Sequence, residues 1–113
     1  MTDRVRLEPL TSRLTVHLGD TLVADTSRGI VVHEQGLPPR YYFPRADVKA
    51  ELARGEGAGT CPWKGKWHHL DVVLGETTVA RGAWTYGETT PVCQPVRDYV
   101  AFYDDKLEVR VAT

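Results

Sequence analysis

Short segments in which polar and apolar residues alternate, separated by turns rich in glycine or proline, run along most of the chain. Residues 13–18 alternate in this way and are followed by Gly19-Asp20 and then by the β-compatible residues 21–24. This pattern is typical of a β-hairpin. Residues 29–34 are rich in β-branched side chains and residues 40–43 in aromatic ones, so each segment predicts a further strand.

The second half of the chain predicts further hairpins. One pairs residues 67–74 with residues 77–80, and residues 83–86 continue its second strand past a glycine, through a bulge. The other pairs residues 99–103 with residues 107–111, where the alternation is the clearest in the chain.

A single helix is predicted, beginning at Pro44. Proline suits the first position of a helix, and Val48 and Leu52 follow four residues apart on one face. The glycines among residues 54–60 are expected to end it. About eight strands joined mostly by hairpins, with this short helix, predict a mainly β fold of two antiparallel sheets packed on each other.

The chain length, 113 residues, is that of a single domain. We expect its core to span residues 13–111 and residues 1–12 to be extended. The composition, 42% hydrophobic and 26% charged, is close to that of globular proteins and argues against disorder.

Charge and hydropathy argue against several classes of partner. Basic and acidic residues are interspersed with a net charge of −1, so the basic patch of a nucleic-acid-binding protein is missing. No apolar stretch approaches the roughly 20 residues that span a bilayer. Residues 1–9 are charged and lack the apolar region of a signal peptide, so we expect a cytoplasmic protein. In that reducing compartment Cys61 and Cys93 are expected to be free thiols rather than a disulfide.

Four motifs occur in order along the chain: Gly36-Leu-Pro-Pro-Arg-Tyr-Tyr-Phe-Pro44 with Asp47-Val48, Cys61-Pro-Trp-Lys-Gly65, Ala83-Trp-Thr-Tyr86 and Tyr99-Val-Ala-Phe-Tyr103. Together they resemble the Domain of Unknown Function 427 family, sometimes labelled a nucleotidyltransferase domain. The resemblance covers most of the chain. It implies the Mss4-like, or β-tent, architecture, in which two antiparallel sheets lean together around a concave face.

The same resemblance bears on metals and cofactors, and we expect neither. Relatives with the Mss4-like architecture often hold zinc with paired Cys-x-x-Cys motifs, which this chain lacks. His68 and His69 are adjacent in a predicted strand, so they point to opposite faces and cannot readily share one metal. Nucleotidyl transfer needs carboxylates that converge on a divalent ion, whereas Asp104 and Asp105 are consecutive and diverge. The chain therefore gives the nucleotidyltransferase label no support.

The candidate catalytic residues are Glu34, Lys64 and Cys61. Glu34 shares a predicted strand face with Ile30 and Val32, and partial desolvation there suits a general acid or base. Alternatively, its carboxylate accepts hydrogen bonds from the adjoining loop. Lys64, on a tight turn, is expected to hold an anion or pair with Glu34, or else to be solvated. Cys61 is a nucleophile only if a cation such as Lys64 lowers its pKa, and is otherwise an inert core residue.

The candidate ligand-binding residues are aromatic: Tyr42, Trp63, Trp84, Tyr86 and Tyr103. Trp84 and Tyr86 lie two residues apart in a predicted strand and therefore share a face. Tyrosine and tryptophan offer a flat apolar surface with a hydrogen-bonding tip, which suits a planar or cationic ligand. Core packing explains such residues equally well.

Three functions fit these residues. The first is a domain that binds a small molecule in an aromatic-lined cleft together with Glu34 and Lys64. The second is an enzyme that uses Glu34 as general acid or base and Lys64 as its electrostatic partner. The third is a structural or protein-interaction module, monomeric or homodimeric through an edge strand. The depth of the expected cleft distinguishes the first two from the third, because an interaction module presents a flat apolar patch.

Overall fold

The computed structural model describes residues 4–112, most of which form β-strands. The strands are β1 (Val5–Leu10), β2 (Leu14–Leu18), β3 (Thr21–Thr26), β4 (Gly29–Glu34), β5 (Arg40–Phe43), β6 (Glu51–Cys61), β7 (Gly65–Leu74), β8 (Thr77–Thr89), β9 (Val100–Phe102) and β10 (Glu108–Val111). Short 3₁₀ turns, η1 (Arg45–Asp47) and η2 (Pro91–Val96), follow β5 and β8. Within the described residues no helix is long and apolar enough to cross a membrane.

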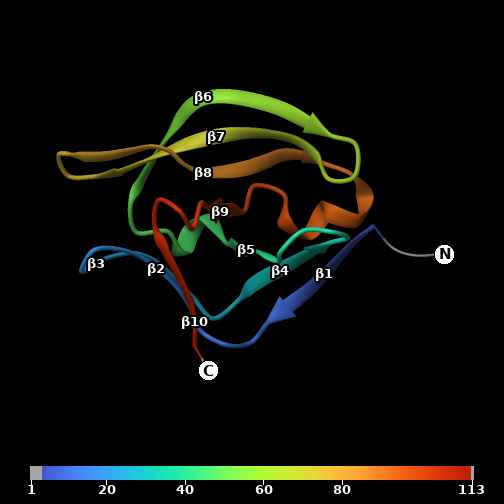
Figure 1. The fold of residues 1–113 in the computed structure, drawn as a ribbon, viewed down its shortest axis with the longest axis horizontal. Helices are drawn as coiled ribbons and strands as arrows, with labels where there is room; N and C mark the ends of the chain where they lie inside the picture. The colour runs from blue at the N-terminus through green and yellow to red at the C-terminus, as the bar shows by residue number, and fades with distance from the viewer. Residues whose placement is uncertain (1–3, 113) are drawn as a thin grey trace.

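The strands form two antiparallel sheets, which confirms the predicted fold class. The larger sheet has seven strands in the order β1-β4-β5-β9-β8-β7-β6, and the smaller has three in the order β10-β2-β3. In Figure 1 the layer of β6, β7 and β8 lies above β4 and β1, and the smaller sheet lies at the lower left. The larger sheet therefore curves over, with β9 as its central strand. The Mss4-like arrangement stays a prediction.

The two faces of the larger sheet each carry an apolar cluster. The first cluster lies against the smaller sheet and includes Leu14, Val16 and Phe43. The second lies on the opposite, concave face and includes Tyr42 and Trp84. Successive side chains of a strand point to opposite faces, so the neighbours Tyr42 and Phe43 belong to different clusters.

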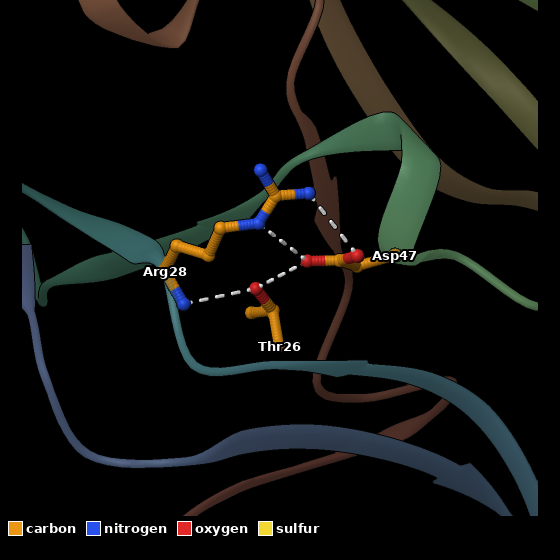
Figure 2. A network of polar contacts seen from close by, with 3 residues as sticks. All are labelled: Thr26, Arg28 and Asp47. Atoms are coloured by element: carbon orange, nitrogen blue, oxygen red, sulfur yellow. Dashed lines mark hydrogen bonds and ion pairs between the residues drawn. The ribbon is translucent and has the colours of Figure 1, made fainter.

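A polar network ties the smaller sheet to the larger one. The hydroxyl of Thr26, at the end of β3, donates to Asp47 Oδ2 over 2.7 Å and accepts from the backbone N–H of Arg28 over 3.0 Å. The Arg28 guanidinium lies 3.2 Å and 3.3 Å from the two carboxylate oxygens of Asp47 (Figure 2). The Thr26 hydrogen bond and the Arg28 pair together lower the pKa of Asp47. Asp47 belongs to η1, so these contacts fix the exit of β5 against the smaller sheet.

The predicted helix from Pro44 to Leu52 is wrong. Only the single 3₁₀ turn Arg45–Asp47 forms, and Val48 then makes an isolated β-bridge with Ala24 of β3. Leu52 lies in β6. Pairing with a strand that is distant in sequence has overridden the local four-residue spacing, because a spacing of four also fits one face of a strand.

The predicted hairpin of residues 99–103 with residues 107–111 is also wrong. β9 pairs with β5 and β8 in the larger sheet, whereas β10 pairs with β2 in the smaller one. The hairpins β2–β3 and β7–β8 are confirmed, the latter with its bulge, where the register shifts between Leu70 and Val72. Residues 5–10 form β1, paired with β4 at the edge of the larger sheet.

Candidate functional site

The concave face of the larger sheet carries a continuous row of cross-strand neighbours. Ile30 pairs with Tyr42, Tyr42 with Ala101, Ala101 with Trp84, and Trp84 with His69. Directly paired residues point to the same face, so all of these side chains share it. Ala101 is the smallest of the row, and the indole Nε1–H of Trp84 donates across it to the Tyr42 hydroxyl over 3.0 Å.

Tyr103, which follows β9, forms an aromatic wall with this row. Its ring centroid lies 4.5 Å from that of Trp84 and 5.7 Å from that of His69. Trp67 stands beside His69 at 5.0 Å and pairs across the strands with Tyr86. The rings meet at tilted or edge-on angles, the arrangement that aromatic pairs prefer.

His69 fixes the position of this wall through both of its ring nitrogens. Nδ1 lies 2.9 Å from the carbonyl oxygen of Glu56, and Nε2 lies 2.9 Å from the Tyr103 hydroxyl. A carbonyl only accepts, so Nδ1 carries the proton, and in the neutral ring Nε2 accepts from Tyr103. Glu56 lies in the bulge of β6, where the glycine backbone passes close to the imidazole. The hydroxyl of Tyr103 is thus held toward β6.

A cleft of about 230 Å³ opens on this concave face. Its walls come from both halves of the larger sheet, from the loop after β4 and from the β6–β7 turn. The lining residues are Val32, Glu34, Leu37, Pro38, Arg40, Lys64, Trp67, Trp84, Tyr86 and Tyr103.

An ion pair of Lys64 with Glu34 crosses one end of the cleft. Lys64 Nζ lies 2.5 Å from Glu34 Oε1, and each side chain is only 14% exposed. Within residues 4–112 this oxygen accepts no well-oriented hydrogen bond, so the ammonium is its close polar contact. Burial acts to lower the pKa of Lys64, but the hydrogen bond to Glu34 and the nearby groups of Tyr42, Glu34 and Cys61 together outweigh burial, and the net pKa is raised. Lys64 is therefore a cation at neutral pH.

The β6–β7 turn holds Lys64 in place. The Lys64 backbone N–H donates to the Cys61 carbonyl over 3.2 Å, and the Lys64 carbonyl accepts from the Thr90 N–H over 3.0 Å. Gly65 follows with a φ of +131°, and a Cβ there would lie 2.1 Å from the carbonyl oxygen of Glu88. Only glycine fits this close approach to β8.

Arg40 adds a second cation to the lining. It pairs with Val32 across β4 and β5 and so shares the concave face, with its guanidinium 5.8 Å from the Trp84 ring centroid. Among the described residues Arg40 forms no ion pair or side-chain hydrogen bond. Asp104 borders a separate hollow that Arg40 also lines, without an ion pair between them.

The structure gathers most of the predicted site residues, but not all of them, around the cleft. Tyr42 lies below the lining, bonded to Trp84 and almost wholly buried. Cys61 is half-buried and packs against the second apolar cluster outside the lining, without a disulfide. Trp63 points away, 44% exposed, with the Arg4 guanidinium 4.3 Å from its ring centroid.

Sequence reasoning missed Arg40, Trp67 and His69. The alternation of strand residues offered a signal for each, because Arg40 lies two residues from Tyr42, and Trp67 and His69 lie two residues apart. What the sequence lacked was the pairing of β5 with β9 and β8, which brings these strand faces together.

Burial changes the acidity of several groups in the second cluster. It raises the pKa of Tyr42, although the hydrogen bond from Trp84 opposes the change, and it raises the pKa of Tyr86 and Tyr103. Burial likewise raises the pKa of the Cys93 thiol. These groups stay neutral at physiological pH. In the part of the chain that the structure describes, no group of three or more His, Cys, Asp or Glu side chains is arranged to hold a metal ion.

Comparison with known proteins gives a family match. The sequence profile of the family described as "Domain of unknown function (DUF427)" matches residues 6–113. No curated protein matches the chain. The matched residues include every segment that lines the cleft.

Proposed function

The chain belongs to this family of unknown function, and from its geometry we propose that it binds a small planar molecule in the concave cleft. The observation that carries the proposal is a cleft lined by several aromatic rings together with charged side chains. Its lining includes the rings of Trp67, Trp84, Tyr86 and Tyr103, and small-molecule sites are lined predominantly by such apolar and aromatic side chains. Here about 230 Å³ stays open beside them.

Polar groups converge on the same hollow, as they do in small-molecule sites. Tyr86 forms no hydrogen bond among residues 4–112 through its hydroxyl, which leaves that donor free for a ligand. The Lys64–Glu34 pair and Arg40 lie along the cleft, with aromatic faces between them. The volume is below the roughly 300–1,000 Å³ usual for such sites, which favours a ligand with a single ring system.

Nuclear magnetic resonance of the indole N–H groups tests the proposal. Trp67 and Trp84 line the cleft, and the exposed Trp63 serves as an internal reference. During titration with phenol, benzamide and indole, we expect at least one compound to shift the Trp67 and Trp84 signals saturably and to leave the Trp63 signal in place. If none of the three compounds gives a saturable shift, the proposal is wrong.

Matched variants locate the binding. Tyr103→Leu removes part of the aromatic wall, whereas Tyr41→Leu changes a half-buried tyrosine that packs against the first cluster, away from the cleft. We expect Tyr103→Leu to weaken binding about tenfold and Tyr41→Leu to leave it unchanged, because only Tyr103 offers its ring to the ligand. Equal weakening by both variants would place the site elsewhere.

The Lys64–Glu34 pair favours a second candidate function, catalysis with Glu34 as general acid or base. The observation behind it is the largely buried Glu34 carboxylate, whose Oε1 lies 2.5 Å from the Lys64 ammonium at one end of the cleft. Lys64, protonated at neutral pH, would stabilise negative charge rather than accept a proton. Slow conversion of a bound compound, followed by proton spectra over hours and abolished in Glu34→Gln, would support catalysis. Unchanged conversion in Glu34→Gln would remove Glu34 from it.

A further inference from the structure

The charge balance of the cleft indicates the class of its ligand. The lining contains one carboxylate, Glu34, and two cations, Lys64 and Arg40. Lys64 is in contact with Glu34, so these two charges offset each other. Arg40 has no acidic partner among residues 4–112. One positive charge on the cleft wall is therefore uncompensated.

Arg40 is also oriented for use by a ligand that stacks in the cleft. Its guanidinium lies 5.8 Å from the ring centroid of Trp84, and Trp84 in turn lies 4.5 Å from Tyr103. Because the guanidinium itself lies over the Trp84 ring, a ligand ring placed against Tyr103 would bring its substituent beside the guanidinium. Guanidinium groups bind carboxylates through two parallel hydrogen bonds, a geometry that a compact ammonium lacks.

We propose that the cleft binds a monoanionic ring compound, a carboxylate attached to a single planar ring, with Arg40 as the group that holds the carboxylate. This inference rests on the proposed small-molecule function and adds the ligand class to it. A single uncompensated cation matches one negative charge, whereas a phosphate chain would need several more positive groups than the lining provides. A cationic ring compound is disfavoured by the same uncompensated charge.

The test uses three compounds with the same ring and different charge: benzoate, benzamide and benzylamine. Each is titrated into the full-length protein, and binding is followed through the indole N–H signals of Trp67 and Trp84. We expect benzoate to bind at least about tenfold more tightly than benzamide. The benzoate carboxylate accepts charge-assisted hydrogen bonds from the Arg40 guanidinium, whereas the neutral amide of benzamide does not carry the charge. Benzylamine is expected to be the weakest of the three.

The variant Arg40→Gln tests the contribution of the guanidinium to binding separately from that of the aromatic rings. In this variant we expect benzoate and benzamide to bind with equal affinity, so that the preference for benzoate vanishes. Arg45→Gln, at an exposed arginine outside the cleft lining, is the matched control and should keep the preference. Dispersed amide spectra confirm that both variants are folded.

Each outcome decides between the two proposals. Equal binding of benzoate and benzamide, or tightest binding of benzylamine, overturns the carboxylate proposal and leaves the cleft as a ring-binding site. A benzoate preference that survives in Arg40→Gln overturns the role of Arg40. Absence of saturable binding by all three compounds overturns the ligand class, and it overturns the small-molecule function as well when phenol and indole also fail to bind.

Discussion

At the scale of single residues, the hydrogen bond between Trp84 and Tyr42 supports the concave face. Tyr42→Phe removes the acceptor and leaves the buried indole N–H unpaired, which we expect to lower the free energy of unfolding by about 1–3 kcal/mol. Tyr99→Phe is the control, because the half-buried Tyr99 hydroxyl forms no hydrogen bond among residues 4–112. It should cost less than about 0.5 kcal/mol. Urea titration measures both, and equal costs would contradict the prediction.

Buried hydroxyls also make stability depend on alkaline pH. Burial raises the pKa of Tyr42 and Tyr86, so above pH 10 the unfolded chain releases protons that the folded protein keeps. The raised pKa of Lys64 acts in the same direction above pH 10.5. We therefore expect these groups to make their full contribution to the free energy of unfolding below pH 10, and this contribution to fall steadily as the pH rises above 10.

The slope of this loss is measurable. Each such group contributes up to about 1.4 kcal/mol per pH unit to the fall in the free energy of unfolding. Urea titrations at intervals between about pH 9 and pH 11.5 give the slope. Tyr42→Phe should have a shallower slope than the unsubstituted protein, and identical slopes would show that the Tyr42 hydroxyl titrates equally in both states.

The sequence predicted a good part of the residue-scale arrangement of the cleft. Alternation placed Glu34 with Val32, and Trp84 with Tyr86, and the structure brings all four into one lining. It did not identify Arg40, because the place of this side chain in the cleft depends on which strands pair with β5. The exposed position of Trp63 could not be predicted from the sequence either, because a turn lacks the alternation of polar and apolar residues that tells which side chains face the core.

At the scale of elements, the β6–β7 turn is the most constrained part of the site. In Gly65→Ala the new methyl group would collide with the backbone of β8 at a positive φ, so we expect a loss of about 3 kcal/mol or more. Gly75→Ala, in the β7–β8 turn, also has a positive φ but meets nothing within 4 Å. It should cost about 1 kcal/mol. Urea or thermal unfolding compares them, and similar losses would refute the close approach of Gly65 to β8.

Prediction from sequence failed in elements whose pattern has more than one explanation. The glycines of residues 54–60 were expected to end a helix, but they lie in β6, an edge strand whose side chains are exposed or half-buried. An edge strand needs little apolar alternation, so its pattern resembles that of a loop. The predicted pairing of β9 with β10 was wrong for a different reason. Alternation identifies which face of a strand is buried, not which strand lies beside it.

At the scale of the whole molecule, both apolar clusters share the strands of one sheet. We therefore expect unfolding to be cooperative, with tryptophan fluorescence, which reports the concave face, and far-ultraviolet circular dichroism, which reports the strands, following one transition in urea. Loss of the fluorescence signal at a lower urea concentration would contradict this, since it would mean that the aromatic cluster disperses while the sheets persist.

The central place of β9 has a consequence for how the protein is made. β9 spans Val100–Phe102, yet it joins β5 to β8 in the middle of the larger sheet. A ribosome releases the chain from its N-terminus at about 5–20 residues per second. Until β9 emerges, the strands β1, β4 and β5 and the strands β6, β7 and β8 are separate groups, each with an open inner edge. The cleft is thus completed only after β9 has left the ribosome, and until then these open edges are the surfaces on which a nascent chain could pair wrongly with another chain.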